Sequence, residues 1–215
     1  RHPDPAFPFG IRTKRLPDWV PEYSVTKAQM SWILVDGEGG RFMNEYQPYL
    51  QDTGHRALDV MNPDTQQYPY IPCYMIVDDP GRKMYPLGGV VFNDREVEPY
   101  EWSGDNLKEV ELGILRKAES LAELADHIGC APAKLEASIV KWNTACAAGE
   151  DDDFKRPSQS MMPITTAPYF VGEIWPVVSN TQGGPVHDAR QRVLNSYGEP
   201  IPGLYEARSE EHTSE

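Results

Sequence analysis

The sequence predicts an α+β fold, in which strands and helices occupy separate stretches of the chain instead of alternating. Three observations lead to this prediction. Apolar, strand-like runs lie before residue 78, two strongly patterned helices lie between residues 120 and 149, and strand-like segments return after residue 174. With 215 residues, of which 40% are hydrophobic and 10% aromatic, the chain is long enough to bury a core.

The N-terminal part predicts strands separated by turns. Residues 1–23 are rich in proline and predict irregular backbone, because proline fixes φ and removes a hydrogen-bond donor. Residues 30–35, MSWILV, predict a buried strand that turns at Asp36-Gly37 and returns with RFMNE. A second strand is predicted from Cys73 to Val77, closed by a DDPG turn.

The two helices are predicted from their ends and their apolar spacing. The segment SLAE at Ser120–Glu123 is a capping box, and Gly129 ends the helix that it begins. A second helix is predicted from Pro132, a good first-turn residue, to Gly149. The short connection between them makes the pair a helical hairpin.

The C-terminal part predicts loops and a β-hairpin. Residues 150–157, EDDDFKRP, lack the alternating ligands and central glycine of a calcium loop, so we interpret them as a solvated turn. A proline-rich link then leads to a predicted strand at 174–178 and a turn, NTQGGP. RQRVLN, SYGEP and IPGLYEA predict a hairpin up to residue 207.

Composition excludes several classes of protein. A net charge of −13 and a pI near 4.8 argue against nucleic-acid binding, which needs clustered Lys and Arg. The three cysteines, Cys73, Cys130 and Cys146, have no paired spacing, so no disulfide framework and no metal site are expected. No apolar run approaches the ~20 residues that span a bilayer, and we predict a cytoplasmic protein without a membrane span. No GxGxxG or GxxxxGK[ST] motif is present.

Three segments, in order, resemble one family. GGRFMNE at 39–45 looks like the "GkRFvNE" segment of the flavoprotein superfamily that contains soluble fumarate reductases, succinate dehydrogenase flavoproteins and 3-ketosteroid Δ1-dehydrogenases. Residues 119–157 resemble the helical hairpin of its capping domain and the loop behind it. Residues 180–207 are similar to its return into the FAD-binding domain. The steroid dehydrogenases are the closest members in motif.

The resemblance implies FAD as the cofactor and a division of the chain. Residues 1–165 would form the capping, substrate-binding domain, and residues 166–207 an incomplete, β-rich return into the α/β FAD-binding domain, whose dinucleotide-binding half would precede residue 1. Residues 208–215, RSEEHTSE, resemble the translation of a common sequencing-library adapter, so we expect them to be a non-native tail.

The resemblance also implies site residues. In steroid dehydrogenases a segment resembling "NE-x-x-P-Y" supplies a tyrosine that takes the α-proton, and here that residue is Tyr49. A phenol with a reference pKa of about 10 is a poor base unless its anion is stabilised. Tyr46, His55 and Arg56 are close enough in sequence to help. Tyr46 and Arg56 are candidate substrate-binding residues.

Two carboxylate-binding positions of fumarate reductases are replaced. Their proton-donating arginine corresponds to Tyr49, and the histidine before their "T-x-GG" turn corresponds to the Ser179-Asn180 stretch, which makes Asn180 a candidate substrate contact. Gly183 and Gly184 are predicted to lie against the flavin, where a Cβ would not fit. Leu204 and Tyr205 are predicted cofactor contacts by resemblance alone.

We therefore expect part of an FAD-dependent oxidoreductase that moves a hydride and a proton across a carbon-carbon bond next to a carbonyl, with a 3-ketosteroid-like ketone as substrate and an unidentified electron acceptor. One alternative is a fumarate-reductase-like alkene reductase that uses Arg56 or Arg41 as proton donor. An alternative of another class is an acidic, non-catalytic binding module. The chain by itself is expected to be inactive.

Overall fold

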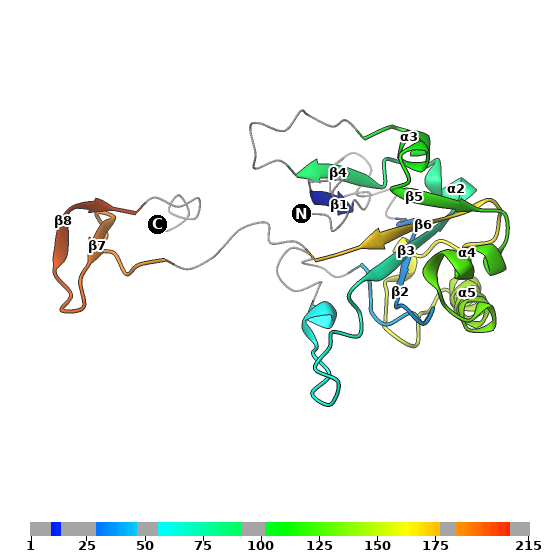
Figure 1. Ribbon diagram of the computed structural model, residues 1–215, viewed down its shortest axis with the longest axis horizontal. Coiled ribbons are helices and arrows are strands. Elements are labelled where there is room, and N and C mark those ends of the chain that lie inside the picture. Colours follow the sequence, from blue (N-terminus) through cyan, green and yellow to red (C-terminus); the bar gives the residue numbers. More distant parts are fainter. Residues whose placement is uncertain (1–9, 14–28, 47–55, 92–101, 177–183, 207–215) are drawn as a thin grey trace. The chain divides into compact units, whose positions relative to one another are not determined.

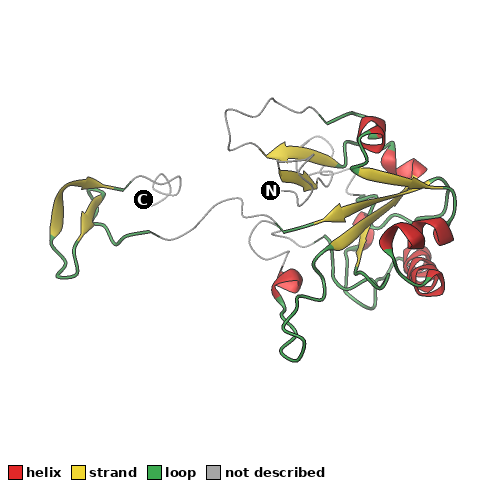
Figure 2. Cartoon of the chain, in the orientation of Figure 1, coloured by secondary structure: helices red, strands yellow, loops and turns green. Residues whose placement is uncertain are grey.

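The computed structural model describes residues 10–13, 29–46, 56–91, 102–176 and 184–206 (Figure 1). The chain divides into two compact units, Arg1–Val177 and Val178–Glu215. Helices and antiparallel sheets are mixed within the first unit, which confirms the predicted class in its coarse form (Figure 2).

The first unit is built on a four-stranded antiparallel sheet with the order β2-β3-β6-β5. Its strands are β2 (Ile33–Val35), β3 (Cys73–Asp78), β5 (Leu115–Ala118) and β6 (Tyr169–Ile174). β3 and β6 pair over six residues, from Cys73 opposite Ile174 to Asp78 opposite Tyr169, and form the centre of the sheet.

Side chains bury both faces of this sheet. One face carries Ile33, Val35 and Ile76 and packs against the helices α4 (Leu121–Ile128) and α5 (Pro132–Ala148). The other face packs under loops and contributes Leu34, Met75, Val77 and Phe170 to a second core cluster. Because both faces are covered, β3 is buried at every position.

Short elements surround the sheet. β1 (Gly10–Thr13) pairs with β4 (Gly88–Val91) in a separate two-stranded sheet. The remaining elements are the 3-10 helices η1 (Arg56–Asp59) and η2 (Ser158–Ser160) and the short α-helices α2 (Asp79–Arg82) and α3 (Leu107–Glu111).

The predicted helical hairpin is confirmed. The Ser120 hydroxyl accepts the N–H of Glu123 at 3.2 Å, and the Glu123 carboxylate accepts the N–H of Glu119 at 2.7 Å. Gly129 and Gly149 end the two helices with φ of 86° and 71°, in the left-handed region where glycine is favoured.

Other predictions needed correction. The strand expected at 174–178 lies at 169–174, because β6 is fixed by pairing with β3 and β5 on both sides. The DDPG turn is the helix α2, which Asp78 caps by accepting the N–H of Gly81 at 3.0 Å. β1, β4, β5 and α3 were not predicted.

The division into compact units differs from the predicted domain boundary. β6 follows residue 165, yet it belongs to the sheet of the first unit, which extends to Val177. The first compact unit is therefore longer than the predicted capping domain. The assignment of residues 166–207 to the FAD-binding domain stays a prediction.

The second unit contains the predicted hairpin, which is confirmed. β7 (Arg192–Leu194) pairs with β8 (Pro200–Tyr205) in antiparallel register. Asn195 closes the turn by accepting the N–H groups of Tyr197 and Glu199. All six residues of β8 are exposed within the described part of the unit.

Candidate functional site

Two predicted motifs, RFMNE and EDDDFKRP, meet in the first unit through four charged side chains. We call Arg41, Glu45, Asp151 and Arg156 the ion cluster. Its members come from the loop after β2 and the loop after α5, and contacts in it join residues about 110 apart in the chain. Two cations and two carboxylates make the cluster neutral as a whole, which is the usual condition for burying charges.

Glu45 is the centre of the ion cluster. Its side chain is fully enclosed and accepts four hydrogen bonds. Oε1 accepts the N–H of Leu34 at 3.0 Å and Nε of Arg41 at 2.8 Å, and Oε2 accepts Nη2 of Arg41 at 2.8 Å and Nη1 of Arg156 at 3.4 Å. The carboxylate thereby fixes the loop after β2 to the strand itself.

Arg156 is buried with an acceptor for each of its five N–H donors. Nη1 donates to the carbonyl of Trp32 at 2.9 Å and to Glu45. Nη2 donates to the carbonyls of Met30 at 2.7 Å and Ser160 at 2.9 Å, and Nε donates to the Ser160 hydroxyl at 3.2 Å. Burial lowers the pKa of this guanidinium, and the charge of Glu45 offsets only part of that effect.

Arg41 is held by both carboxylates and by aromatic rings. Its Nη2 also donates to Asp151 at 2.8 Å, and its guanidinium carbon lies 4.5 Å from the ring centroid of Trp142. Arg156 stacks on the same indole at 4.7 Å. Burial alone would lower the pKa of Arg41, but Glu45 and Asp151 raise it above its ordinary value. Arg41 is therefore a permanent cation, and its Nε and Nη2 groups are bound to the two carboxylates.

Asp151 shows that residues 150–157 are not simply a solvated turn. Its side chain is 2% exposed, and it accepts the N–H of Arg156 at 3.1 Å besides the bond from Arg41. Burial raises the pKa of this carboxyl, but the contacts with Arg41 and the backbone N–H groups of Arg156 and Phe154 together lower the pKa overall. The sequence pattern gave no sign of this, because the partner lies in a distant segment.

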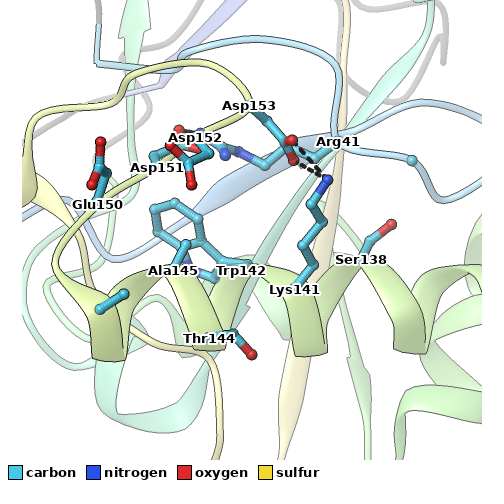
Figure 3. Close-up of a pocket in the computed structure, with 12 residues that line it drawn as sticks. Arg41, Ser138, Lys141, Trp142, Thr144, Ala145, Glu150, Asp151, Asp152 and Asp153 are labelled. Atoms are coloured by element: carbon cyan, nitrogen blue, oxygen red, sulfur yellow. Dashed lines mark hydrogen bonds and ion pairs between the residues drawn. The ribbon is translucent and has the colours of Figure 1, made fainter.

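A cavity of about 450 Å³ opens beside the ion cluster (Figure 3). The side chains from α5 line one side of it, and the acidic loop after α5 lines the other. Lys141 reaches across to Asp153 at 2.6 Å, so the cationic and acidic groups at the rim are paired. The lining includes Ser138, Thr144, Ala145, Glu150 and Asp152.

The predicted substrate residues are only partly within the described ranges. Tyr46 is half-buried and packs against the second core cluster, and its N–H donates to the Asn44 side chain at 2.9 Å. Arg56 is exposed at the start of η1. Tyr49 and Asn180, with Gly183, lie outside the described residues, and the structure does not test their roles.

The predicted cofactor residues of the second unit are exposed. Leu204 is 46% and Tyr205 64% accessible. A Cβ at Gly184 would meet the carboxylate of Glu206, which is the end of a flexible side chain and can move aside. The exposed backbone at Gly184 is compatible with the predicted approach of a flat ring system such as a flavin, and that contact stays a prediction.

Other titratable groups serve the fold. Burial raises the pKa of the Cys73 thiol to about 12 and of the Cys146 thiol to about 11, so neither is a ready nucleophile. His187 lies 3.3 Å from Glu206, whereas Asp188 pairs with Arg192, so the two neighbours do not form a dyad. In the described ranges, no group of three His, Cys, Asp or Glu side chains is suited to a metal ion. None of the described helices has the length and apolar character to cross a membrane.

The comparison with protein families identifies the chain. A family model described as an FAD binding domain matches residues 24–207. The chain therefore belongs to the FAD-binding domain family of flavoproteins, and FAD is the cofactor of this family.

Individual relatives agree with this assignment. The chain is 28% identical to a 3-oxosteroid 1-dehydrogenase of Mycolicibacterium smegmatis over 81% of its length, and 29% identical to a fumarate reductase (cytochrome) of Shewanella frigidimarina over 81%. It covers 32% and 26% of those two proteins, so it spans between a quarter and a third of their length. Among solved structures, a 3-ketosteroid delta1-dehydrogenase from Sterolibacterium denitrificans in complex with 1,4-androstadiene-3,17-dione superposes with a TM-score of 0.60 at 26% identity, over 83% of this chain and 33% of that one.

Proposed function

We propose that this chain is the capping, substrate-binding part of an FAD-dependent oxidoreductase that dehydrogenates a ketone next to its carbonyl. A 3-ketosteroid-like compound is the proposed substrate and Tyr49 the proposed proton acceptor. The similarity to steroid dehydrogenases over most of the chain supports the proposal. It extends to the predicted division into a capping domain, residues 1–165, and a return segment, residues 166–207.

The observation that carries the choice of reaction is the enclosure of Arg41. A fumarate-reductase-like alkene reductase needs a cation that delivers a proton to the substrate, and Arg41 is one of its two candidates here. The Arg41 side chain is 8% exposed, donates to Glu45 and Asp151, and stacks on Trp142. Although Arg41 also lines the cavity, three hydrogen bonds to carboxylates and its stacking on Trp142 hold it inside the fold, and this supports a structural role for Arg41 over that of proton donor.

The remaining candidate for the alkene reductase is Arg56, which is exposed at η1. The exposure of Arg56 is the one observation that favours the alkene reductase as a second candidate function. The two reactions differ in the group at the cleft: a neutral phenol suits an apolar ketone, whereas a permanent guanidinium suits a carboxylate. The non-catalytic alternative has less support, since the chain belongs to a family defined by cofactor binding.

The proposed chemistry assigns a proton to the chain and a hydride to the cofactor. The Tyr49 phenolate takes the proton from the carbon next to the carbonyl, a double bond forms towards the neighbouring carbon, and that carbon loses a hydride. Bound FAD supplies the hydride acceptor. Gly184, Leu204 and Tyr205 are the described residues that would contact it. Tyr46 and Arg56 are proposed to help hold the substrate and stabilise the phenolate.

The first test is anaerobic flavin absorbance of the complete natural protein while a 3-ketosteroid is added. Bleaching of the flavin band is expected. If the ketone leaves the flavin oxidised, and a fumarate-like alkene reoxidises the reduced flavin instead, the protein is an alkene reductase and the proposed reaction is wrong. If the complete protein binds no flavin, the non-catalytic binding module is the alternative that remains.

The role of Tyr49 is tested by Tyr49→Phe in the same protein. Flavin should stay bound, while turnover falls by about 10²–10⁴, the usual contribution of a general acid or base. Tyr46→Phe is the matched control, because it removes the same hydroxyl three residues earlier and should cost turnover less. Full activity of Tyr49→Phe would remove that residue from the mechanism.

A further inference from the structure

In the second unit, the carboxylate of Glu206 lies over the bare backbone of Gly184. One of its oxygens occupies the space that a Cβ at Gly184 would take. Nδ1 of His187 lies 3.3 Å from Oε2 of Glu206, within reach of a hydrogen bond, and the N–H of Glu206 donates to the carbonyl of Gln191 at 2.9 Å. All residues of β8 are exposed, yet the Glu206 side chain that follows them is only 12% accessible.

We propose that Glu206 is a further cofactor-contact residue of this chain, a carboxylate beside the flavin that lowers the reduction potential of bound FAD. His187 positions this carboxylate. The inference rests on the proposed function, in which Gly184 contacts FAD.

The position of Glu206 over Gly184 supports the contact. The flavin is proposed to lie at Gly184 because no Cβ blocks the approach there, and Glu206 lies on that same side. The Glu206 side chain can move aside for a ring. Its backbone is fixed to Gln191, however, so the carboxylate stays within a side-chain length of the ring.

The charges of the second unit give the direction of the effect. Reduction adds electrons to the flavin, and a neighbouring carboxylate opposes the negative charge that they bring. Asp188 is paired with Arg192, whose Nε and Nη2 donate to it at 2.8 and 2.5 Å. Glu199 lies in the turn between β7 and β8. Among the described residues, Glu206 is therefore the carboxylate that contacts Gly184.

The experiment is a potentiometric titration of the complete flavoprotein at pH 8, where imidazole side chains are usually neutral. Glu206→Gln keeps the size of the side chain and removes its charge. The equilibrium between oxidised and reduced FAD should shift towards the reduced form by roughly tenfold, which raises the midpoint potential of a two-electron couple by about 30 mV. This readout does not depend on turnover.

Glu199→Gln is the matched control, because it removes the same charge from the other end of the hairpin. The backbone partners of Glu206 and Glu199 are Gln191 and Asn195. An extended chain between these partners spans roughly 13 Å. This exceeds the Debye length of ~8 Å at physiological ionic strength, so the midpoint potential should stay close to that of the parent.

His187→Lys tests the same charge without removing Glu206. A lysine cation beside the carboxylate should neutralise it and raise the midpoint potential as Glu206→Gln does. This variant replaces Glu206→Gln if that variant does not fold or does not hold FAD.

The outcomes separate the inference from the function on which it rests. A complete protein that binds no FAD overturns both. If FAD is bound but the ketone does not reduce it, the proposed reaction is wrong, and the midpoint potentials still test Glu206. Equal potentials in the parent, Glu206→Gln and His187→Lys overturn only the role of Glu206. A shift of equal size in Glu199→Gln also overturns it, because the effect then does not depend on the contact with Gly184.

Discussion

At the scale of single residues, Arg41 is the side chain whose environment the sequence could not reveal. It was a candidate proton donor as long as only its neighbours in RFMNE were known. Its second carboxylate, Asp151, and the ring of Trp142 lie about 100 residues away in the chain. Pattern analysis detects neighbours along an element, so a partner supplied by the tertiary fold escapes it.

Replacing Arg41 should destabilise the fold strongly. Arg41→Met keeps the stem that packs on Trp142 but leaves Glu45 and Asp151 without their shared cation. Breaking a buried pair in this way costs about 3–5 kcal/mol of the free energy of unfolding, because a charge is left uncompensated. Urea unfolding monitored by tryptophan fluorescence measures it.

Lys141→Met supplies the comparison for Arg41. It breaks the exposed ion pair between Lys141 and Asp153, whose side chains are 69% and 37% accessible, respectively. Exposed pairs of this kind contribute about 0–1 kcal/mol. Equal losses in Arg41→Met and Lys141→Met would show that the ion cluster contributes no more than a surface pair.

At the scale of elements, local signals predicted what local forces determine. α4 and α5 begin and end at the predicted residues because a capping hydroxyl, a first-turn proline and two left-handed glycines act within one turn. The hairpin β7-β8 was predicted for the same reason. β6 was misplaced because its position depends on two partner strands. Its Gly172 is needed there, since a Cβ would lie 2.9 Å from the Leu115 side chain on β5.

The cap of α4 gives a prediction at this scale. Ser120→Ala removes the acceptor for the N–H of Glu123 and should lower the free energy of unfolding by about 1 kcal/mol. Thr144→Ala is the comparison, because it removes a hydroxyl that bonds only to the Val140 carbonyl inside α5, where alanine is the better helix former. Thermal unfolding followed by circular dichroism should show a lower Tm for the first variant only.

At the scale of the whole molecule, the sequence predicted the family and the mixed fold but not how the first unit holds together. RFMNE and EDDDFKRP could be recognised in the sequence, whereas their contact around Glu45 depends on the folded structure. The roles of the predicted site residues are not tested by the structure and stay predictions. Tyr49, Gly183 and Asn180 lie outside the described residues, and the cofactor contact proposed for Gly184 likewise stays a prediction.

The ion cluster also makes the stability of the first unit depend on acid. Burial raises the folded pKa of Asp151, but Arg41 and the backbone N–H groups of Arg156 and Phe154 together lower it, while an unfolded aspartate titrates near 3.9. Below about pH 5 the Asp151 carboxylate therefore begins to bind a proton in the unfolded chain while it stays ionised in the folded chain. The contribution of Asp151 is fully present above that range and is lost as the pH falls through the folded pKa.

Asp151→Asn tests this dependence. The variant should be less stable at pH 7, because Arg41 loses a charged partner, yet its free energy of unfolding should fall less steeply between pH 5 and pH 3 than that of the parent. Asp153→Asn removes the same charge from a more exposed position two residues on, and should follow the parent slope because exposed pairs contribute little. Urea unfolding at a series of pH values gives the slopes. If Asp151→Asn and the parent lost stability in parallel, the acid sensitivity would have to come from carboxylates outside the ion cluster.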